Sequence, residues 1–319
     1  MDNLFNIERL GVRKKFPKIK SFIKQYFLCL EEWQEVYLPR LQRYGNGESF
    51  SYSNSPDFIF EYDFSSAMDD LLRVSAVKYW HAIHGAFKQE GDWQMYWKQA
   101  VAYGCWSDLM EIKWHFHALE EFNGGKRPQK LKMLMFHRIG MHIGNCLSLG
   151  WSDLCIDLAR WTYKALAAEL FNDGGDYSHR RTQYFVLRLV MDWQNMPFDL
   201  DVKSAYDEPI FNALIENWRE PDAEKLVPVL LAACDRHTQQ ARVDSNRESY
   251  DLNQPEHDYN PFEILSVFRL RDLNGLANPV LDHPLMKTPL AQLLPVSTPY
   301  MDELLAGILS HARQEFPDL

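Results

Sequence analysis

Apolar residues recur along most of this chain at spacings of three and four, which is the period of an amphipathic helix. Between Pro17 and Tyr44, one such stripe contains Ile19, Phe22, Ile23, Phe27, Leu30 and Trp33. Few segments alternate with the period of two that marks a half-buried strand. The pattern therefore predicts an all-α protein made of packed helical hairpins.

Residues that can accept free backbone N–H groups mark several helix starts. Asp92 is expected to cap a helix over 93–104, and Ser107 or Asp108 to cap the next one. Pro228 lies early in a helix over 222–243, where it kinks the helix rather than breaks it. Further helices are expected at about 65–91, 130–149, 153–171, 180–194, 206–218, 260–275 and 300–316.

Four polar or glycine-rich segments interrupt these helices, and they are expected to be loops. They lie at 45–58, 122–129, 172–179 and 244–261. The second of them contains two glycines and a proline, so we place a boundary there between an N-terminal helical domain at 1–125 and a C-terminal one at 126–319. A proline-rich stretch at 278–295 is expected to run extended over the surface, held by Leu281, Leu285 and Leu290.

One short pattern occurs twice. WSDL at 106–109 recurs at 151–154, and WHFHAL at 114–119 resembles WTYKAL at 161–166. In both copies a glycine is expected to end one helix, Ser-Asp to start the next, and the tryptophan to pack at the corner. A single helical hairpin cannot bury its apolar face alone, whereas stacked neighbours can. We therefore expect Trp106 and Trp151 to hold the scaffold.

Composition and charge exclude several classes of function. Hydrophobic residues make up 46% of the 319 residues, and the formal net charge is −10. Such a chain can bury a core and repels nucleic acids and anionic membranes, so neither is expected as a direct partner. The N-terminus has no apolar signal sequence, and no apolar run approaches the roughly 18 residues of a membrane span. The five cysteines form no C-x-x-C pair, which favours a reducing cytoplasm.

The sequence contains no strong motif for catalysis or for a metal or cofactor. His115 and His117 are two residues apart, so on a helix they point in opposite directions and cannot share a metal. We expect no metal site and no cofactor. The least implausible acid–base set is His237, Asp235 and Glu263, and a deep pocket joining these three would favour an enzyme.

The polar stretch at 244–260 mixes acids with tyrosines, which is typical of a surface that holds a basic partner. An ordinary solvated loop is the alternative, although loops of this length in a compact domain are usually functional or disordered. The candidate partner-binding residues are Asp244, Glu248, Tyr250, Asp251, Glu256, Asp258 and Tyr259, together with Asp173 and Asp176 from the loop at 172–179.

The C-terminal third resembles a known family. The segments DRHTQQA (235–241), YNPFEILSVFRLRDLNGL (259–276) and NPVLDHPLMKTPLAQLLP (278–295) are similar to the end of all-α bacterial immunity proteins. These proteins neutralise polymorphic toxins, notably nuclease effectors delivered by type VI secretion. The matching residues are Tyr259, Phe262, Glu263, Leu270, Gly275 and Pro284.

The resemblance implies a cytoplasmic inhibitor that needs no catalytic residues. Its partner would be a cognate toxin, and a nuclease toxin is basic because it binds phosphates. An acidic inhibitor would associate with it quickly and in a salt-dependent way. Two alternatives stay open: a helical-repeat adaptor or effector chaperone that binds a segment in a groove, and an enzyme that uses His237, Asp235 and Glu263.

Overall fold

The computed structural model describes residues 8–13, 33–55, 58–123, 134–171 and 179–319. The fold is all-α, as the hydrophobic period predicts: helices make up most of the described chain, and its sheet has two strands. The chain divides into two compact units. Unit 1 contains Met1–Ile19 and Met133–Thr298, and unit 2 contains Lys20–Lys132 and Pro299–Leu319.

This division differs from the expected domains, 1–125 and 126–319, because each unit takes a segment from the other end of the chain. The expected boundary itself lies outside the described residues. Near the N-terminus, Arg9 forms an ion pair with Asp235, and the N–H of Arg13 donates to Thr238 Oγ1 at 3.0 Å. These contacts attach the start of the chain to unit 1.

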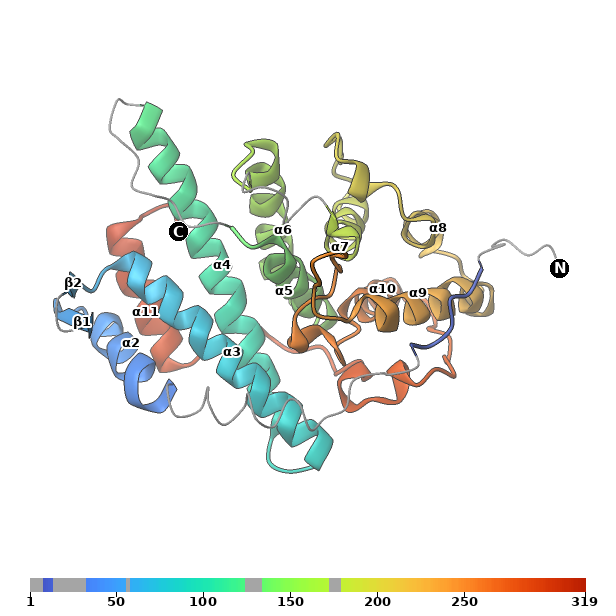
Figure 1. The fold of residues 1–319 in the computed structure, drawn as a ribbon, viewed down its shortest axis with the longest axis horizontal. Coiled ribbons are helices and arrows are strands. Elements are labelled where there is room, and N and C mark those ends of the chain that lie inside the picture. The colour runs from blue at the N-terminus through green and yellow to red at the C-terminus, as the bar shows by residue number, and fades with distance from the viewer. Residues whose placement is uncertain (1–7, 14–32, 56–57, 124–133, 172–178) are drawn as a thin grey trace. The chain divides into compact units, whose positions relative to one another are not determined.

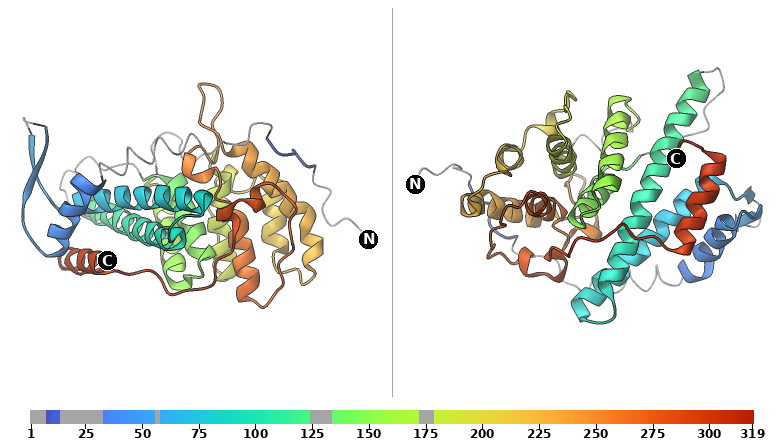
Figure 2. Two further views of the ribbon diagram at one scale, coloured as in Figure 1. Left: turned by 90° about the horizontal axis from the view of Figure 1, so that it is seen from below. Right: turned by 180° about the vertical axis from the view of Figure 1, so that it is seen from behind.

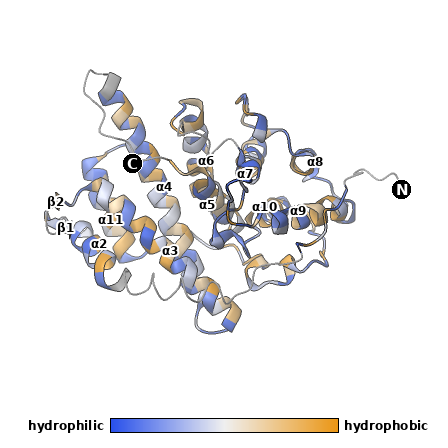
Figure 3. Cartoon of the chain, in the orientation of Figure 1, coloured by the Kyte–Doolittle hydropathy of each residue, from blue (hydrophilic) through white to orange (hydrophobic). Residues whose placement is uncertain are grey.

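Unit 2 is built on a pair of long helices, α3 (Phe64–Lys88) and α4 (Trp93–Asn123), which pack along each other (Figure 1). Apolar and polar residues are mixed along both helices (Figure 3), and the middle of α4 is buried on every side, since residues 100–105 and 107–112 are all buried. The Asp63 side chain accepts from Ser66 N at the start of α3, and Asp92 accepts from Met95 N at the start of α4. The cap predicted at Asp92 is confirmed.

The remaining elements of unit 2 pack around this pair. The chain before α3 contributes a π-helical turn η1 (Trp33–Tyr37), helix α2 (Leu38–Gly45) and a hairpin of β1 (Ser51–Ser55) and β2 (Phe58–Glu61). The C-terminal segment contributes α11 (Glu303–Glu315). Helix α11 packs on α2, where Gly45 and Gly307 meet. A Cβ on Gly307 would lie 3.1 Å from Gly45 O, so small residues permit this close contact.

Two predictions for unit 2 are wrong. The segment at 45–58 is not all loop, because β1 and β2 pair antiparallel, with Tyr52 opposite Phe60 and Ser51 opposite Glu61. Aromatic residues with high strand propensity favour this hairpin. The predicted long helix from Pro17 lies mostly outside the described residues, as does the predicted loop at 122–129.

The second wrong prediction concerns the first copy of the repeated pattern. No helix ends at Gly104: α4 runs through the whole segment, and Ser107 and Asp108 are buried inside it rather than at a cap. Ser107 Oγ donates to Met68 O of α3 at 2.9 Å. A glycine inside a helix costs only about 1 kcal/mol, and tight packing against α3 outweighs that cost.

The second copy behaves as predicted. Gly150 has φ +75°, and its N–H donates to Leu147 O at 2.8 Å, so it ends one helix just before the next begins at Ser152. Trp151 is buried at this corner, and its Nε1 donates to Ser297 Oγ at 3.2 Å. A Cβ on Gly150 would lie 2.9 Å from Val296, so the corner is packed closely.

Unit 1 is a group of shorter helices around a central one, α5 (Phe136–Ser148), whose partners are α6, α7 and α10. The other helices are α6 (Ser152–Ala167), α7 (Arg181–Trp193), α8 (Pro209–Asn217), α9 (Val227–Gln240) and α10 (Phe262–Leu273). Short 3-10 turns link them: η3 (Lys203–Ala205), η4 (Ala223–Leu226), η5 (Pro255–His257), η6 (Leu285–Lys287) and η7 (Pro289–Ala291).

The C-terminal part of unit 1 follows the sequence expectation. Helix α10 ends at Leu273, with Gly275 in the left-handed region at φ +68°. The stretch at 278–295 is mostly non-helical, and Leu281, Leu285 and Leu290 are buried, which confirms them as its anchors. Pro228 lies in the first turn of α9, directly after η4, so the helix begins there rather than kinks.

Gly144 in α5 permits close approach of α10. A Cβ at this position would lie 2.5 Å from Phe262 Cδ2 and 3.2 Å from Phe262 Cβ. Gly→Ala inside a helix ordinarily stabilises by about 0.5–1 kcal/mol. Here we expect Gly144→Ala to destabilise by about 1–3 kcal/mol in urea unfolding, because the added methyl overpacks the contact. Phe262→Leu in the Gly144→Ala background should recover part of the loss. A more stable Gly144→Ala protein would show that α10 is not packed against α5 in this way.

Candidate functional site

The polar stretch at 244–260 is attached to the core of unit 1 by a buried ionic network. Asp251 is 2% exposed, and its carboxylate accepts from the guanidinium of Arg236 at 2.5 Å. It also accepts from the N–H and from the hydroxyl of Thr182, both at 3.0 Å. Arg236 also donates to Glu208 Oε2 at 2.6 Å. Asp251 therefore fixes this stretch to the N-terminus of α7, where a negative charge is favourable.

A second arginine fastens the same stretch through its backbone. Arg180 is buried, and its Nη1 donates to the carbonyls of Tyr250 and Asp251 at 2.9 and 3.1 Å, and to Asn253 Oδ1 at 2.9 Å. Gln183 Nε2 donates to Asp251 O at 2.9 Å. The stretch is thus an ordered segment with a buried base rather than a freely solvated loop.

Several of the predicted partner-binding residues are consequently internal. Asp251 and Tyr259 are buried, so their assignment to a contact surface is corrected. Asp244 is exposed, but both of its oxygens accept within the segment, from Tyr250 N and Asn253 Nδ2, each at 2.7 Å. Glu248 is exposed and bonds to the hydroxyl of Tyr250.

The remaining predicted residues are divided between half-buried positions and positions that are not described. Tyr250, Glu256 and Asp258 are half-buried. Asp173 and Asp176, with most of the loop at 172–179, lie outside the described residues. Of the acids predicted to form a surface at 244–260, only Asp244 and Glu248 are exposed, and exposed Arg247 lies between them in the sequence.

Asp258 gives this segment a pH dependence. Burial raises its pKa from 3.8 to about 7, against the opposing charges of Arg13 and His237. The folded protein then binds a proton that the unfolded chain has already released, so stability falls as pH rises from about 4 to above 7. We expect Asp258→Asn to gain stability over the wild type between about pH 5 and pH 8, with the difference growing with pH. If the free energies of unfolding of the two proteins differ by the same amount at every pH in this range, the pKa of Asp258 is not raised by burial.

The three residues of the expected acid–base set are buried and do not form one site. His237 Nδ1 lies 2.7 Å from Glu263 Oε1, and His237 Nε2 lies 3.0 Å from the carbonyl of His257. Because Nε2 faces a carbonyl oxygen, it donates there, which leaves Nδ1 for the bond to Glu263. Asp235 contacts other residues: Arg9, and His283 Nε2 at 3.2 Å.

These pairs connect the three segments that carry the family resemblance. The His237–Glu263 pair joins the first segment to the second, and the Asp235–His283 pair joins the first to the third. Arg269 of the second segment donates to the carbonyl of Leu294 in the third. These polar contacts between the three segments hold α9, α10 and the stretch after α10 together.

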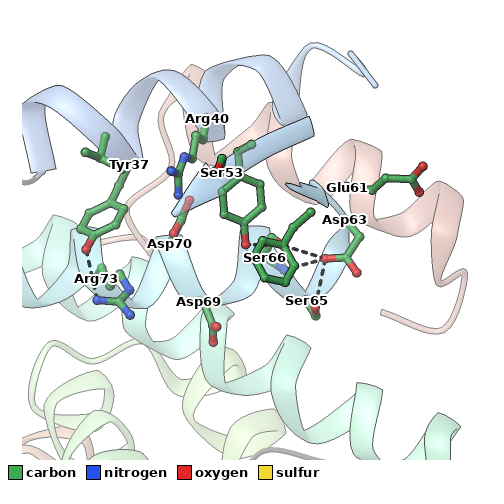
Figure 4. Close-up of a pocket in the computed structure, with 13 residues that line it drawn as sticks. Tyr37, Arg40, Ser53, Glu61, Asp63, Ser65, Ser66, Asp69, Asp70 and Arg73 are labelled. Carbon is green, nitrogen blue, oxygen red and sulfur yellow. Dashed lines mark hydrogen bonds between the residues drawn. The ribbon is translucent and has the colours of Figure 1, made fainter. Parts of the chain in front are cut away.

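Unit 2 contains a cavity of about 650 Å³ beside the hairpin (Figure 4). Its walls come from η1, α2, both strands and the first turns of α3. Arg73 Nη1 donates to the hydroxyl of Tyr37 at 3.1 Å, and the Arg40 guanidinium lies 4.2 Å from the ring centroid of Tyr52. Tyr62 donates to Asp70 at 3.0 Å behind this wall.

The lining of this cavity has more acids than bases, and it includes the exposed aromatic side chain of Phe60. Four acids and two arginines line it, a formal charge of −2: Glu61, Asp63, Asp69 and Asp70 against Arg40 and Arg73. On β2, Ile59 is 78% exposed and Phe60 is 44% exposed. The sequence analysis missed this cavity because it treated 45–58 as a loop. The aromatic run FIFEYDF at 58–64 was the available signal.

Exposed acids outnumber exposed Lys and Arg residues in both units. Among the described residues, unit 2 has eleven exposed acids and four exposed Lys or Arg, and unit 1 has thirteen and eight. The four cations of unit 2 are Arg43, Arg73, Lys88 and Arg313. A surface of this kind attracts basic partners.

The structure provides little for other chemistries within the described ranges. There, no group of three or more His, Cys, Asp or Glu residues could hold a metal ion. Four cysteines of that part, Cys105, Cys146, Cys155 and Cys234, are buried, and burial raises the pKa of the Cys234 thiol. In the same part of the chain, no helix has the length and apolar character needed to cross a membrane.

Comparisons of the chain with protein-family models, curated proteins and solved structures found no match in any of the three.

Proposed function

We propose that this chain is an immunity protein that binds a basic nuclease toxin in the bacterial cytoplasm and neutralises it without catalysing a reaction itself. The observation that carries the proposal is the excess of exposed acids, above all the eleven against four in unit 2. A nuclease must present cations to bind phosphates, so such a surface complements the region that the inhibitor has to cover.

The buried polar side chains of unit 1 contact one another inside the fold, and this supports the same proposal. His237, Glu263, Asp235 and His283 are paired with one another inside the fold, and the cavity of unit 2 is lined by none of them. An inhibitor requires a stable scaffold of this kind to present its surface. The resemblance of 235–295 to immunity proteins of type VI secretion nucleases agrees with it, because those segments form the connected scaffold of unit 1.

A pull-down from the source bacterium tests the proposal. The tagged chain is used as bait at about 100 mM and about 500 mM salt, since exposed charges are screened strongly over this range. We expect recovery of one basic protein at low salt and much less at high salt, and we expect its nuclease activity to be silenced by this chain.

Other results would favour other functions. A large secreted protein that is recovered but left fully active would indicate an effector chaperone or adaptor. Absence of any partner at both salt concentrations would contradict the immunity proposal and direct attention to His237 and Glu263 as an acid–base pair.

A further inference from the structure

Residues 8–13, which we call the strap, lie beside α9 in unit 1, and they are dark blue in Figure 1 and in the left view of Figure 2. The Arg9 guanidinium donates to both carboxylate oxygens of Asp235, at 2.7 and 2.9 Å. Gln239 Nε2 donates to the carbonyl of Gly11 at 2.9 Å. These bonds hold the first part of the strap over Asp235, whose side chain is fully buried.

The end of the strap lies close to Asp258, because consecutive residues of α9 hold both. The N–H of Arg13 donates to Thr238 Oγ1 at 3.0 Å. His237, the preceding residue of α9, places its Nε2 3.0 Å from the carbonyl oxygen of His257, which directly precedes Asp258. Burial lowers the pKa of Arg13, and the charge of Asp258 opposes this effect. A guanidinium and a carboxyl group therefore face each other at the end of the strap.

Neither of these two groups has a partner in the part of the chain that the structure describes. There, the Arg13 guanidinium forms no hydrogen bond or ion pair, and its Nε is buried. Asp258 is half-buried, and within the same ranges its carboxyl group forms neither kind of contact. A buried donor without an acceptor is unfavourable, so pairing with an ionised Asp258 would stabilise Arg13.

Five further ionisable groups act on this pair: Arg242, Tyr250 and Tyr259 act on Arg13, and His237 and Glu256 act on Asp258. Arg242 is held elsewhere, because its Nη2 donates to Gln239 Oε1 at 2.7 Å and its guanidinium lies over the ring of Tyr250. Tyr259 stays neutral, because burial raises its pKa to about 12. Both ring nitrogens of His237 are in hydrogen bonds. Among these described groups, Arg13 is the cation whose guanidinium is free to pair with Asp258.

We infer that the strap is a pH-sensitive latch, closed when Arg13 pairs with ionised Asp258 and open when Asp258 is protonated. In the closed state the ion pair fastens the end of the strap to the turn before α10. In the open state this end keeps only its backbone hydrogen bond to Thr238. Burial raises the pKa of Asp258 to about 7, so the change occurs near neutral pH. This inference is independent of the proposed function.

The latch responds to pH in the opposite direction to the fold as a whole. Global unfolding removes the burial of Asp258, so ionisation of this group lowers the free energy of unfolding. Opening of the strap removes Arg13 instead, so Asp258 binds a proton more tightly in the open state and ionisation favours closure. The sign of the pH dependence therefore separates opening of the strap from unfolding of the unit.

Hydrogen exchange of the full chain tests the latch. The readout is the protection of the backbone amide at position 13, which donates to Thr238, between pH 6 and pH 8 after correction for the intrinsic exchange rate. We expect wild-type protection to rise about 5-fold over this range, because the ion pair forms as Asp258 ionises. Arg13→Gln and Asp258→Asn should each remove the rise. Arg247→Gln, at an exposed position of the stretch that contains Asp258, is the matched control and should keep it.

A titration of the Asp258 carboxyl carbon by NMR gives an independent readout. Arg13 opposes the burial that raises the pKa of Asp258, so Arg13→Gln should raise this pKa further. Arg247→Gln should leave it unchanged. This measurement does not require the Asp258→Asn variant, so it gives a result even if that variant fails to fold.

The outcomes that overturn the latch are specific. Protection at position 13 that stays constant or falls between pH 6 and pH 8 in the wild type would contradict it, as would an equal rise in the Asp258→Asn protein. A pKa of Asp258 that does not change in the Arg13→Gln protein would mean that the two groups do not pair. None of these results bears on the proposed function, which is tested by the silencing of a nuclease.

Discussion

Arg236→Ala is expected to destabilise unit 1 by about 3–5 kcal/mol, because it leaves a buried carboxylate without its counter-charge. The Arg236 side chain is 5% exposed and Asp251 is 2% exposed, and Glu208 shares the same guanidinium. The loss extends beyond the ion pair, since Asp251 also accepts from Thr182 at the start of α7. Denaturant unfolding followed by circular dichroism measures the change.

An exposed pair provides the control for this prediction. Arg219 and Asp192 form an ion pair with side chains 47% and 35% exposed, so Arg219→Ala should cost about 0–1 kcal/mol. The double variant Arg236→Met and Asp251→Asn should lose less than the sum of the single changes, because the buried Asp251 carboxylate is removed together with its partner and only the less buried Glu208 loses its counter-charge. An Arg236→Ala protein as stable as the Arg219→Ala protein would mean that Asp251 is not buried against it.

Trp151→Ala is expected to cost about 3–5 kcal/mol, because the indole fills the corner between α5 and α6. The variant should aggregate or unfold at lower denaturant concentration than the wild type, rather than lose partner binding selectively. Trp161→Ala is the control, since Trp161 lies in α6, the helix that begins directly after Trp151, and is only half-buried, so its loss should cost less. A Trp151→Ala protein that folds normally but no longer binds its partner would contradict the role of Trp151 in the scaffold.

Local sequence signals predict the helices well where they agree with the tertiary packing. Asp92 caps α4 and Gly150 ends α5 in the expected way, because capping and left-handed glycines depend on a few adjacent residues. The prediction failed at Gly104, because Gly104 and the WSDL segment that follows it lie inside α4 rather than at a helix end. The packing of α4 against α3 decides that region, and a pattern within one segment does not reveal its neighbour.

The role of the acidic stretch was harder to predict for the same reason. Asp251 is buried by Arg236, Thr182 and Arg180, two of which are about 70 residues away in the sequence. Nothing near Asp251 in the sequence separates it from exposed Glu248. The sequence therefore indicated an acidic segment correctly but could not show which of its carboxylates face the solvent.

The cavity of unit 2 depends on residues from separate segments as well. Arg40, Phe60 and Asp69 lie on α2, β2 and α3, and the packing of these elements brings them to one cavity. Aromatic residues at every second position over 58–64 were the one local indication of a strand. Once the hairpin is recognised, its register places Phe60 opposite Tyr52 and Glu61 opposite Ser51, but the exposed fractions of these side chains depend on the helices around them.

The most direct test of the immunity proposal is a titration of the recovered nuclease with the purified chain. Nuclease activity is measured on DNA and on RNA at increasing ratios of chain to nuclease, at low salt. The proposal predicts a linear fall that reaches zero activity at one equivalent, as expected of a tight stoichiometric inhibitor, and recovery of activity as salt weakens the complex. Full activity in the presence of a saturating excess of bound chain would contradict it.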